Sequence, residues 1–269
     1  MRSKAGKLEQ IRVIFRTLFE RWGHQHWWPA ETSFEVIVGA YLTQNTAWTN
    51  VERALIRLRE AGVLSVKGIR SIEISELEKL IRSAGYFRQK ASRLKQFVTF
   101  LDQRHGGSLE RMFSTSTERL REELLGLSGV GPETADSIIL YAGQHAIFVV
   151  DAYTRRILER HGLATASTKY EEIRMLVEAA LTGETLGLAE IDPAMLPKGS
   201  CHSPSAMSTA SRCAQAQVFN EMHGLIVGVG KNYCLKSKPK CEECPLGPLL
   251  PKGKKFRIGL KVNSGGMSQ

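Results

Sequence analysis

The chain has 269 residues, of which 42% are hydrophobic and 24% are charged, a balance typical of a folded globular protein rather than a disordered or fibrous one. No apolar run approaches the roughly 20 residues of a membrane-spanning helix, and the N-terminus lacks the apolar core of a secretory signal, so we expect a cytoplasmic protein without a membrane partner. The net charge of +10 favours a polyanionic partner, although the positive residues are spread along the chain.

Apolar residues recur at helical spacing through most of the chain, which predicts an all-α fold. We expect helices near residues 8–22, 34–42, 51–58, 76–84, 91–101, 120–125, 132–142, 152–161, 170–181 and 217–229. Ser75 and Glu78 form a capping-box pattern for the fourth of these, and Gly85 follows where that helix should stop. Only residues 147–150 are typical of a strand, and four residues cannot form a sheet.

Two segments depart from the helical pattern. Residues 182–213 are rich in Gly, Pro and Ser, which predicts a mobile surface insertion. The tail after Pro251 is basic and contains several glycines, and we expect it to be disordered.

A glycine-rich segment before Pro132 is the most informative part of the sequence. The preceding helix should end at Leu125, and Gly126, Gly129 and Gly131 then permit tight backbone turns. Pro132 suits the first position of the next helix, where its missing N–H costs least. Backbone amides left exposed at such a helix start bind phosphate without reading base sequence. The segment is therefore either a DNA-binding hairpin or an ordinary corner between two helices.

Asp151 follows an apolar run, residues 148–150, and stands at the start of a predicted helix. By itself this context is explained by an ordinary N-cap. Its position twenty residues after Gly131 becomes informative when Asp151 is considered together with the hairpin.

Together, the glycine-rich hairpin and Asp151 resemble the helix-hairpin-helix (HhH-GPD) DNA glycosylase superfamily, specifically its endonuclease III branch. Three more segments extend the resemblance in the expected order: residues 42–46 (LTQNT) with 50–51 (NV), residues 85–91 (GYFRQKA), and residues 220–227 (NEMHGLIV) with 230–234 (GKNYC). The resemblance covers about residues 25–182 and 217–250.

This resemblance implies two helical lobes with a DNA-binding cleft. One lobe would comprise residues 28–130 and end in the hairpin. The other would comprise residues 1–27 and 131–233, including the insertion at 182–213. Residues 234–250 would form a Cys-rich loop of the iron–sulfur type, and residues 251–269 a basic tail. The partner would be double-stranded DNA containing a damaged base, bound by a monomer.

Members of this family extrude the target nucleotide into a pocket, and cleavage of its glycosidic bond builds positive charge on the sugar. The resemblance implies that Asp151 stabilises this charge and orients or deprotonates the attacking water. It implies five DNA-binding residues: Gln44, Arg88, Lys90, Gly129 and Gly131. Gln44 would help to fill the gap left by the flipped base, and Arg88 or a neighbour would wedge into the base stack.

Glu133 stands where bifunctional members carry the lysine that forms a Schiff base, and a carboxylate cannot form an imine. An acid in the first turn of a helix is also favoured by the helix dipole alone. The sequence is closer to the 3-methyladenine-type relatives, which implies a monofunctional glycosylase for alkylated purines. Five aromatic residues could stack on such a base: Trp27, Trp28, Trp48, Tyr86 and Phe87.

Three other functions stay open. The first is an oxidised-pyrimidine glycosylase with AP lyase activity, which would use another amine. The second, adenine removal from mismatches, is disfavoured because Ala40 stands where that branch has a Glu. The third is a non-enzymatic DNA-binding module with the same hairpin, which would not need Asp151 or the Gln44 motif in register.

The five cysteines are an odd number in a chain without an export signal, which argues against a disulfide framework. Three of them match three of the four ligands of the family's 4Fe-4S loop: Cys234, Cys241 and Cys244. The expected fourth cysteine is Leu250. Cys201 or Cys213 could fold back, or a residue other than Cys could serve. A three-thiolate zinc site and a metal-free loop are the alternatives.

Overall fold

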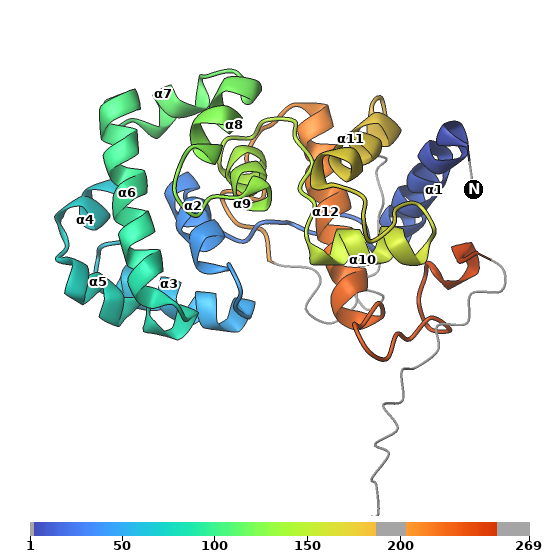
Figure 1. Ribbon diagram of the computed structural model, residues 1–269, viewed down its shortest axis with the longest axis horizontal. Helices are drawn as coiled ribbons and strands as arrows, with labels where there is room; N and C mark the ends of the chain where they lie inside the picture. The colour runs from blue at the N-terminus through green and yellow to red at the C-terminus, as the bar shows by residue number, and fades with distance from the viewer. Residues whose placement is uncertain (1–2, 187–202, 252–269) are drawn as a thin grey trace, which may run out of the picture.

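The computed structural model describes residues 3–186 and 203–251, and every regular element in these ranges is a helix (Figure 1). The predicted all-α fold is therefore confirmed. None of the helices in the described ranges combines the length and apolarity needed to cross a bilayer. The predicted disordered tail beyond Pro251, residues 187–202 of the predicted insertion, and Cys201 lie outside the described residues.

Figure 1 shows the helices in two groups. On the left lie α2 (Ser33–Leu42), α3 (Trp48–Glu60), α4 (Val66–Ser71), α5 (Ile74–Leu80), η1 (Arg82–Ala84), α6 (Phe87–His105), α7 (Leu109–Phe113), α8 (Thr117–Leu125), α9 (Pro132–Ser137) and η2 (Ile138–Ala142). On the right lie α1 (Lys4–Trp22), α10 (Ala152–Arg160), α11 (Tyr170–Leu181), α12 (Ala214–Asn232) and η4 (Gly247–Leu249).

The observed helices follow the predicted ones with three differences. The capping box predicted at Ser75 is wrong, because α5 already begins at Ile74 and no side chain caps it. Two short helices, α4 and α7, were not predicted, since five or six residues contain too few apolar repeats to reveal a period. The helix predicted for residues 132–142 begins as α9 and continues as the π-helical segment η2.

Two buried helices form the centres of the two groups. In α12, every residue from Val218 to Gly230 is buried, and α1, α10 and α11 pack around it. In α2, every residue from Phe34 to Leu42 is buried, with contacts to α3, α6, α9 and η2. Such all-round burial is what an apolar helix without a polar face requires.

Residues 147–150 belong to no helix and pair with no strand, so the expected isolated strand is not formed. Their backbone amides instead donate to side chains of α11: Phe148 N–H to Glu178 at 2.9 Å, and Val150 N–H to the Tyr170 hydroxyl at 3.2 Å. The same hydroxyl donates to Asp136 of α9 at 2.9 Å. Through Tyr170, these bonds link the residues just before Asp151 to α9, the helix that follows the hairpin.

The described end of the predicted insertion is packed, not a mobile surface segment. The amide of Met207 donates to the carbonyl of Ala30 at 3.0 Å, and the amide of Ala30 donates to the Ser205 hydroxyl at 3.2 Å. Met207 and Ser208 are buried. The segment therefore supports the residues just before α2, a contact that composition alone does not reveal.

Candidate active site and cysteine pocket

Asp151 is the N-cap of α10, and its Oδ1 accepts a hydrogen bond of 2.7 Å from the amide of Thr154. Its Oδ2 lies 3.7 Å from Nε2 of His223. The carboxylate, with 13% of its side chain exposed, lines a cavity of about 470 Å³. Capping fixes one carboxylate oxygen, so Asp151 is held in place without being enclosed in the core.

Three tryptophans form part of the cavity wall. Trp27 and Trp28 come from the segment before α2, and Trp48 is the first residue of α3. The rings of Trp28 and Trp48 meet edge to face with centroids 5.0 Å apart. Gly224 of α12 permits the close approach of Trp27, because a Cβ at that position would lie 3.1 Å from the Trp27 Cβ. The cavity thus presents flat apolar surfaces suited to stacking on a planar ring.

Glu133, in the first turn of α9, lines the same cavity as Asp151. Its side chain is open to the cavity, so water reaches it in the free protein. Partial loss of hydration inside the cavity raises the pKa of Glu133 to about 7, and the nearby charge of Asp151 contributes to this shift. Two carboxyl groups therefore share one cavity, and Glu133 is only partly charged near neutral pH.

Two residues of α12 that were not among the predicted site residues also line the cavity. His223 is buried, and its Nδ1 lies 2.6 Å from the hydroxyl of Tyr141 in η2. Lys231 lies nearer the end of α12, with its ammonium 5.7 Å from the centre of the Trp27 ring. Burial lowers the pKa of Lys231, although the charges of Glu52 and Asp151 oppose this. The sequence placed His223 in the predicted helix 217–229 and Lys231 just beyond its end, but gave no sign that either residue faces Asp151.

Gln44 and the hairpin are directly linked. The Gln44 amide donates to the Gly129 carbonyl at 3.0 Å and to the Thr134 hydroxyl at 2.9 Å, and its oxygen accepts from Arg93 at 2.9 Å. Gly129 has a φ of 77°, which favours glycine, whereas Gly131 is extended and N-caps α9. Both glycines are exposed, so three of the five predicted DNA-binding residues lie together on one face.

Lys90 does not lie on that face, and this prediction needs correction. Only 1% of Lys90 is exposed, and its ammonium donates to the carbonyls of Leu42, Gln44 and Ala84 at 2.8–2.9 Å. It thus satisfies carbonyls at the end of α2 and in η1 that would otherwise be unpaired. Lys90 is a structural cation that cannot reach a phosphate.

Arg88 is exposed over 82% of its side chain and lies 3.9 Å from Glu78. The neighbouring Tyr86 is 68% exposed and has a left-handed φ of 44° as it caps α6. Tyr86 and Phe87, which were predicted as part of the stacking wall, are not among the residues lining the cavity of Asp151. An exposed aromatic side chain at this turn is available to a partner instead.

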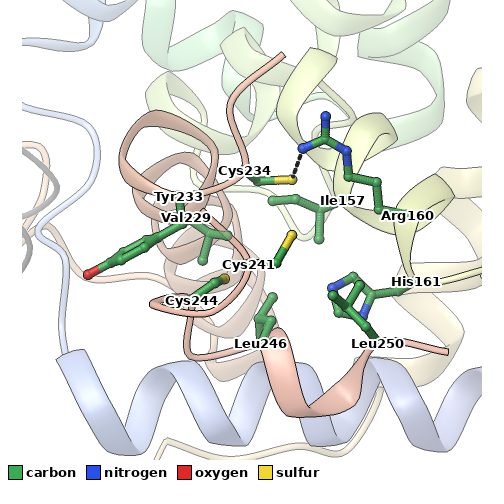
Figure 2. Close-up of a pocket in the computed structure, with 11 residues that line it drawn as sticks. Ile157, Arg160, His161, Val229, Tyr233, Cys234, Cys241, Cys244, Leu246 and Leu250 are labelled. Carbon is green, nitrogen blue, oxygen red and sulfur yellow. Dashed lines mark hydrogen bonds between the residues drawn. The ribbon is translucent and has the colours of Figure 1, made fainter. Parts of the chain in front are cut away.

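Three cysteines of the loop after α12 surround one small pocket (Figure 2): Cys234, Cys241 and Cys244. Burial, with a smaller contribution from the neighbouring thiols, raises the pKa of Cys244 to about 11 and raises that of Cys241. Within the described residues, no three His, Cys, Asp or Glu side chains converge on a point that could hold one metal ion.

Leu250 lines the pocket, at the position where the fourth cysteine was expected. Figure 2 shows the ring of His161, the residue that ends α10, beside Leu250 and turned toward the pocket. Cys213 cannot complete the set, because it caps the far end of α12, whose 19 residues span about 28 Å. Three thiolates and one imidazole are suitable donors for an iron–sulfur cluster, so these residues fit that group in kind.

Comparison with known protein families identifies the family of this chain. The sequence model of the HhH-GPD superfamily of base excision DNA repair proteins matches residues 38–181, more than half of the chain. The chain belongs to this superfamily. The matched range contains Gln44, the hairpin and Asp151, so the resemblance inferred from those motifs is confirmed.

Two relatives of this HhH-GPD protein are named as a DNA repair glycosylase and an endonuclease III. A Methanocaldococcus jannaschii protein, named provisionally as a DNA repair glycosylase, is 40% identical and aligns over 90% of this chain and 96% of its own length. Endonuclease III of Thermotoga maritima is 26% identical over 87% of this chain and 89% of its own length. The protein is therefore a member of the DNA glycosylase family of base excision repair.

Two solved structures share the fold. A 3-methyladenine DNA glycosylase of H. pylori, bound to 1,N6-ethenoadenine, is 27% identical, covers 84% of this chain and 97% of its own, and gives a TM-score of 0.64. An endonuclease III trapped covalently on DNA is 22% identical, covers 94% of this chain and 98% of its own, and gives a TM-score of 0.68. The second likeness concerns the fold alone.

Proposed function

We propose that this protein is a monofunctional DNA glycosylase that removes alkylated purines from double-stranded DNA by hydrolysis. The observation that carries the proposal is the composition of one cavity. Asp151 shares it with tryptophan rings, and the hairpin contributes Glu133 to it where a lyase would contribute a lysine. The H. pylori 3-methyladenine glycosylase, with the same fold, supports this substrate class.

Asp151 would carry the chemistry. As the glycosidic bond breaks, positive charge develops on the sugar. A carboxylate fixed by the Thr154 amide needs little rearrangement to stabilise that charge, and its second oxygen can take a proton from the attacking water. An N-alkylated purine is itself cationic and leaves as a neutral base, so this reaction does not need a strong acid.

Trp27 and Trp48 would receive the extruded base. Aromatic faces attract planar cations, because the ring carries negative charge density above its plane. In the free protein the Lys231 ammonium lies over Trp27, which indicates that this ring is accessible to a cation. A cationic base would compete for the same surface.

The DNA would bind across the hairpin and the turn before α6. Exposed Gly129 and Gly131 offer backbone groups to phosphate, Gln44 lies against the hairpin, and Arg88 adds charge. Exposed Tyr86 is the best candidate for a wedge that replaces the extruded base in the stack. Binding should weaken as salt rises from low to moderate concentration, because phosphate contacts release counterions.

The proposal is tested with a set of duplexes that each carry one lesion. The released base is measured by chromatography, and strand breaks are measured with and without alkali. We expect release of alkylated purines and strand breaks only after alkali. Strand breaks without alkali would contradict the monofunctional assignment.

One observation favours a second function, oxidised-pyrimidine removal with AP lyase activity. Lys231 brings an amine into the cavity, and burial lowers the pKa of this amine. Borohydride reduction during the reaction separates the two functions. A covalent protein–DNA adduct that disappears in Lys231→Ala and persists in Lys236→Ala would establish the lyase, whereas no adduct in either protein supports hydrolysis.

We also propose that the cysteine loop binds a 4Fe-4S cluster through its three cysteines, with His161 as the fourth donor. When bound, the cluster would cross-link the loop to the end of α10. We propose no role for the cluster in excision. Anaerobically purified protein should contain iron and sulfide and absorb at about 400 nm. His161→Ala should lose iron, and adding Leu250→Cys should restore it. A native protein without iron would contradict the proposal.

A further inference from the structure

Three polar side chains from distant parts of the chain stand in a row that ends at Asp151. The Tyr141 hydroxyl lies 2.6 Å from His223 Nδ1, and His223 Nε2 lies 3.7 Å from Asp151 Oδ2. Tyr141 and His223 are both buried, yet His223 reaches the cavity that Asp151 lines. The row thus connects the protein interior to the carboxylate proposed to carry the reaction.

The surroundings fix which nitrogen of His223 bears the proton. Burial and the charge of Asp151 raise the pKa of Tyr141 well above its usual value, so its hydroxyl stays protonated. The Asp151 carboxylate oxygen lies 3.7 Å from Nε2 and would repel a lone pair there, so the proton belongs on Nε2 and Nδ1 accepts from the Tyr141 hydroxyl. Burial lowers the pKa of His223, which is therefore neutral and carries its proton on Nε2.

The Nε2–H donor has no hydrogen-bond partner among the described residues. A buried donor left unpaired costs about 1–3 kcal/mol, and 3.7 Å is too long for a direct bond to Asp151. Asp151 Oδ1 is occupied by the Thr154 amide, whereas Oδ2 faces His223. A single water molecule could accept from Nε2–H and donate to Oδ2, which would satisfy both groups.

We propose that His223 is a positioning residue that, together with Asp151, holds the attacking water. The inference rests on the proposed hydrolytic function. The water oxygen, held by Nε2–H, directs a lone pair at C1′ of the sugar and forms the new C–O bond. The base departs with the electron pair of the glycosidic bond, and the water proton passes to Asp151 Oδ2. Tyr141 takes no part in the reaction and only keeps His223 in the donating tautomer.

Two substitutions of His223 separate this role from simple packing. His223→Gln keeps an N–H donor but loses the ring, whereas His223→Phe keeps a ring but loses the donor. We expect His223→Phe to lower the single-turnover excision rate by about 100-fold, and His223→Gln to recover most of that loss. The dissociation constant for lesion-containing DNA should stay unchanged in both. Thermal unfolding shows that each variant is folded.

The reverse order, with His223→Phe active and His223→Gln impaired, would assign His223 to packing and overturn the inference. Tyr141→Phe provides a second measurement if His223→Phe does not fold. It should slow excision less than loss of the donor does, and a rate equal to that of the unmodified protein would overturn the inference. Absence of excision by the unmodified protein on every lesion would overturn the proposed function and this inference with it.

Discussion

The cavity of Asp151 and the cysteine pocket lie at opposite ends of α10 but are built in different ways. Asp151 begins this helix, whereas Arg160 and His161 end it beside the cysteines. The cavity collects side chains from segments before α2, from α3, from the hairpin and from α12. The cysteine loop is almost continuous in sequence, so its composition can be read directly, including the missing fourth cysteine.

This difference in construction indicates that the two regions serve different functions. The cavity contains a carboxylate, a second acid, an imidazole and aromatic walls, all supplied by the protein itself. The loop is held to α10 partly by arginines: Arg156 donates to the Cys234 carbonyl at 2.7 Å, and Arg160 donates to the Cys234 sulfur at 3.0 Å. We therefore expect the cavity to govern the rate of excision and the loop to govern stability.

The largest expected effect is on the rate and belongs to the cavity. Asp151→Asn should lower single-turnover excision by about 10²–10⁴-fold, because an amide can neither accept the water proton nor balance the charge on the sugar. Binding of lesion-containing DNA, measured by fluorescence anisotropy, should stay close to normal. Near-normal excision by this variant would remove Asp151 from the mechanism.

The second effect is on stability and belongs to the loop. Arg160→Ala removes bonds from the end of α10 to the Cys234 sulfur and the Lys236 carbonyl. It should lower the free energy of unfolding by about 2 kcal/mol, since charge-assisted bonds are lost, and leave the single-turnover rate unchanged. Denaturant unfolding with single-turnover kinetics checks both parts. A slower chemical step in a folded variant would break the separation between the two regions.

The third effect concerns pH and sharpens the description of the cavity. The raised pKa means that Glu133 is protonated below about pH 7 and charged above it. Excision of a neutral lesion such as 1,N6-ethenoadenine should therefore fall as pH rises through about 7, approaching tenfold per pH unit if the protonated form is required. Glu133→Gln, which is neutral at every pH, should flatten this limb. An unchanged limb in the variant would assign it to another group.

The smallest effect lies outside both regions, on the surface before α6. Arg88→Ala should weaken DNA binding only modestly and reduce the slope of log affinity against log salt by about one unit, as expected for one lost phosphate contact. Binding titrations at several salt concentrations measure this slope. Arg104→Ala at the far end of α6 is a control for the loss of one positive charge, and an equal change in both variants would argue against a specific contact.

The sequence by itself determined the local features of this protein. Helical periodicity, the hairpin turn at Gly129 and the N-cap at Asp151 follow from interactions between residues close together in the chain, and the order of such motifs indicated the family. Such interactions span a few residues, so the residue types and their spacing are sufficient to predict them.

Only the tertiary structure decided which polar groups meet. Lys90 and Arg88 are two residues apart and similar in charge, yet one is buried beneath three carbonyls and the other is exposed. His223 and Lys231 reach Asp151 only because α10 packs on α12, and that same helix separates Cys213 from the cysteine pocket. Whether a side chain is buried or lines a cavity depends on neighbours from distant segments of the chain. A short sequence pattern does not reveal those neighbours.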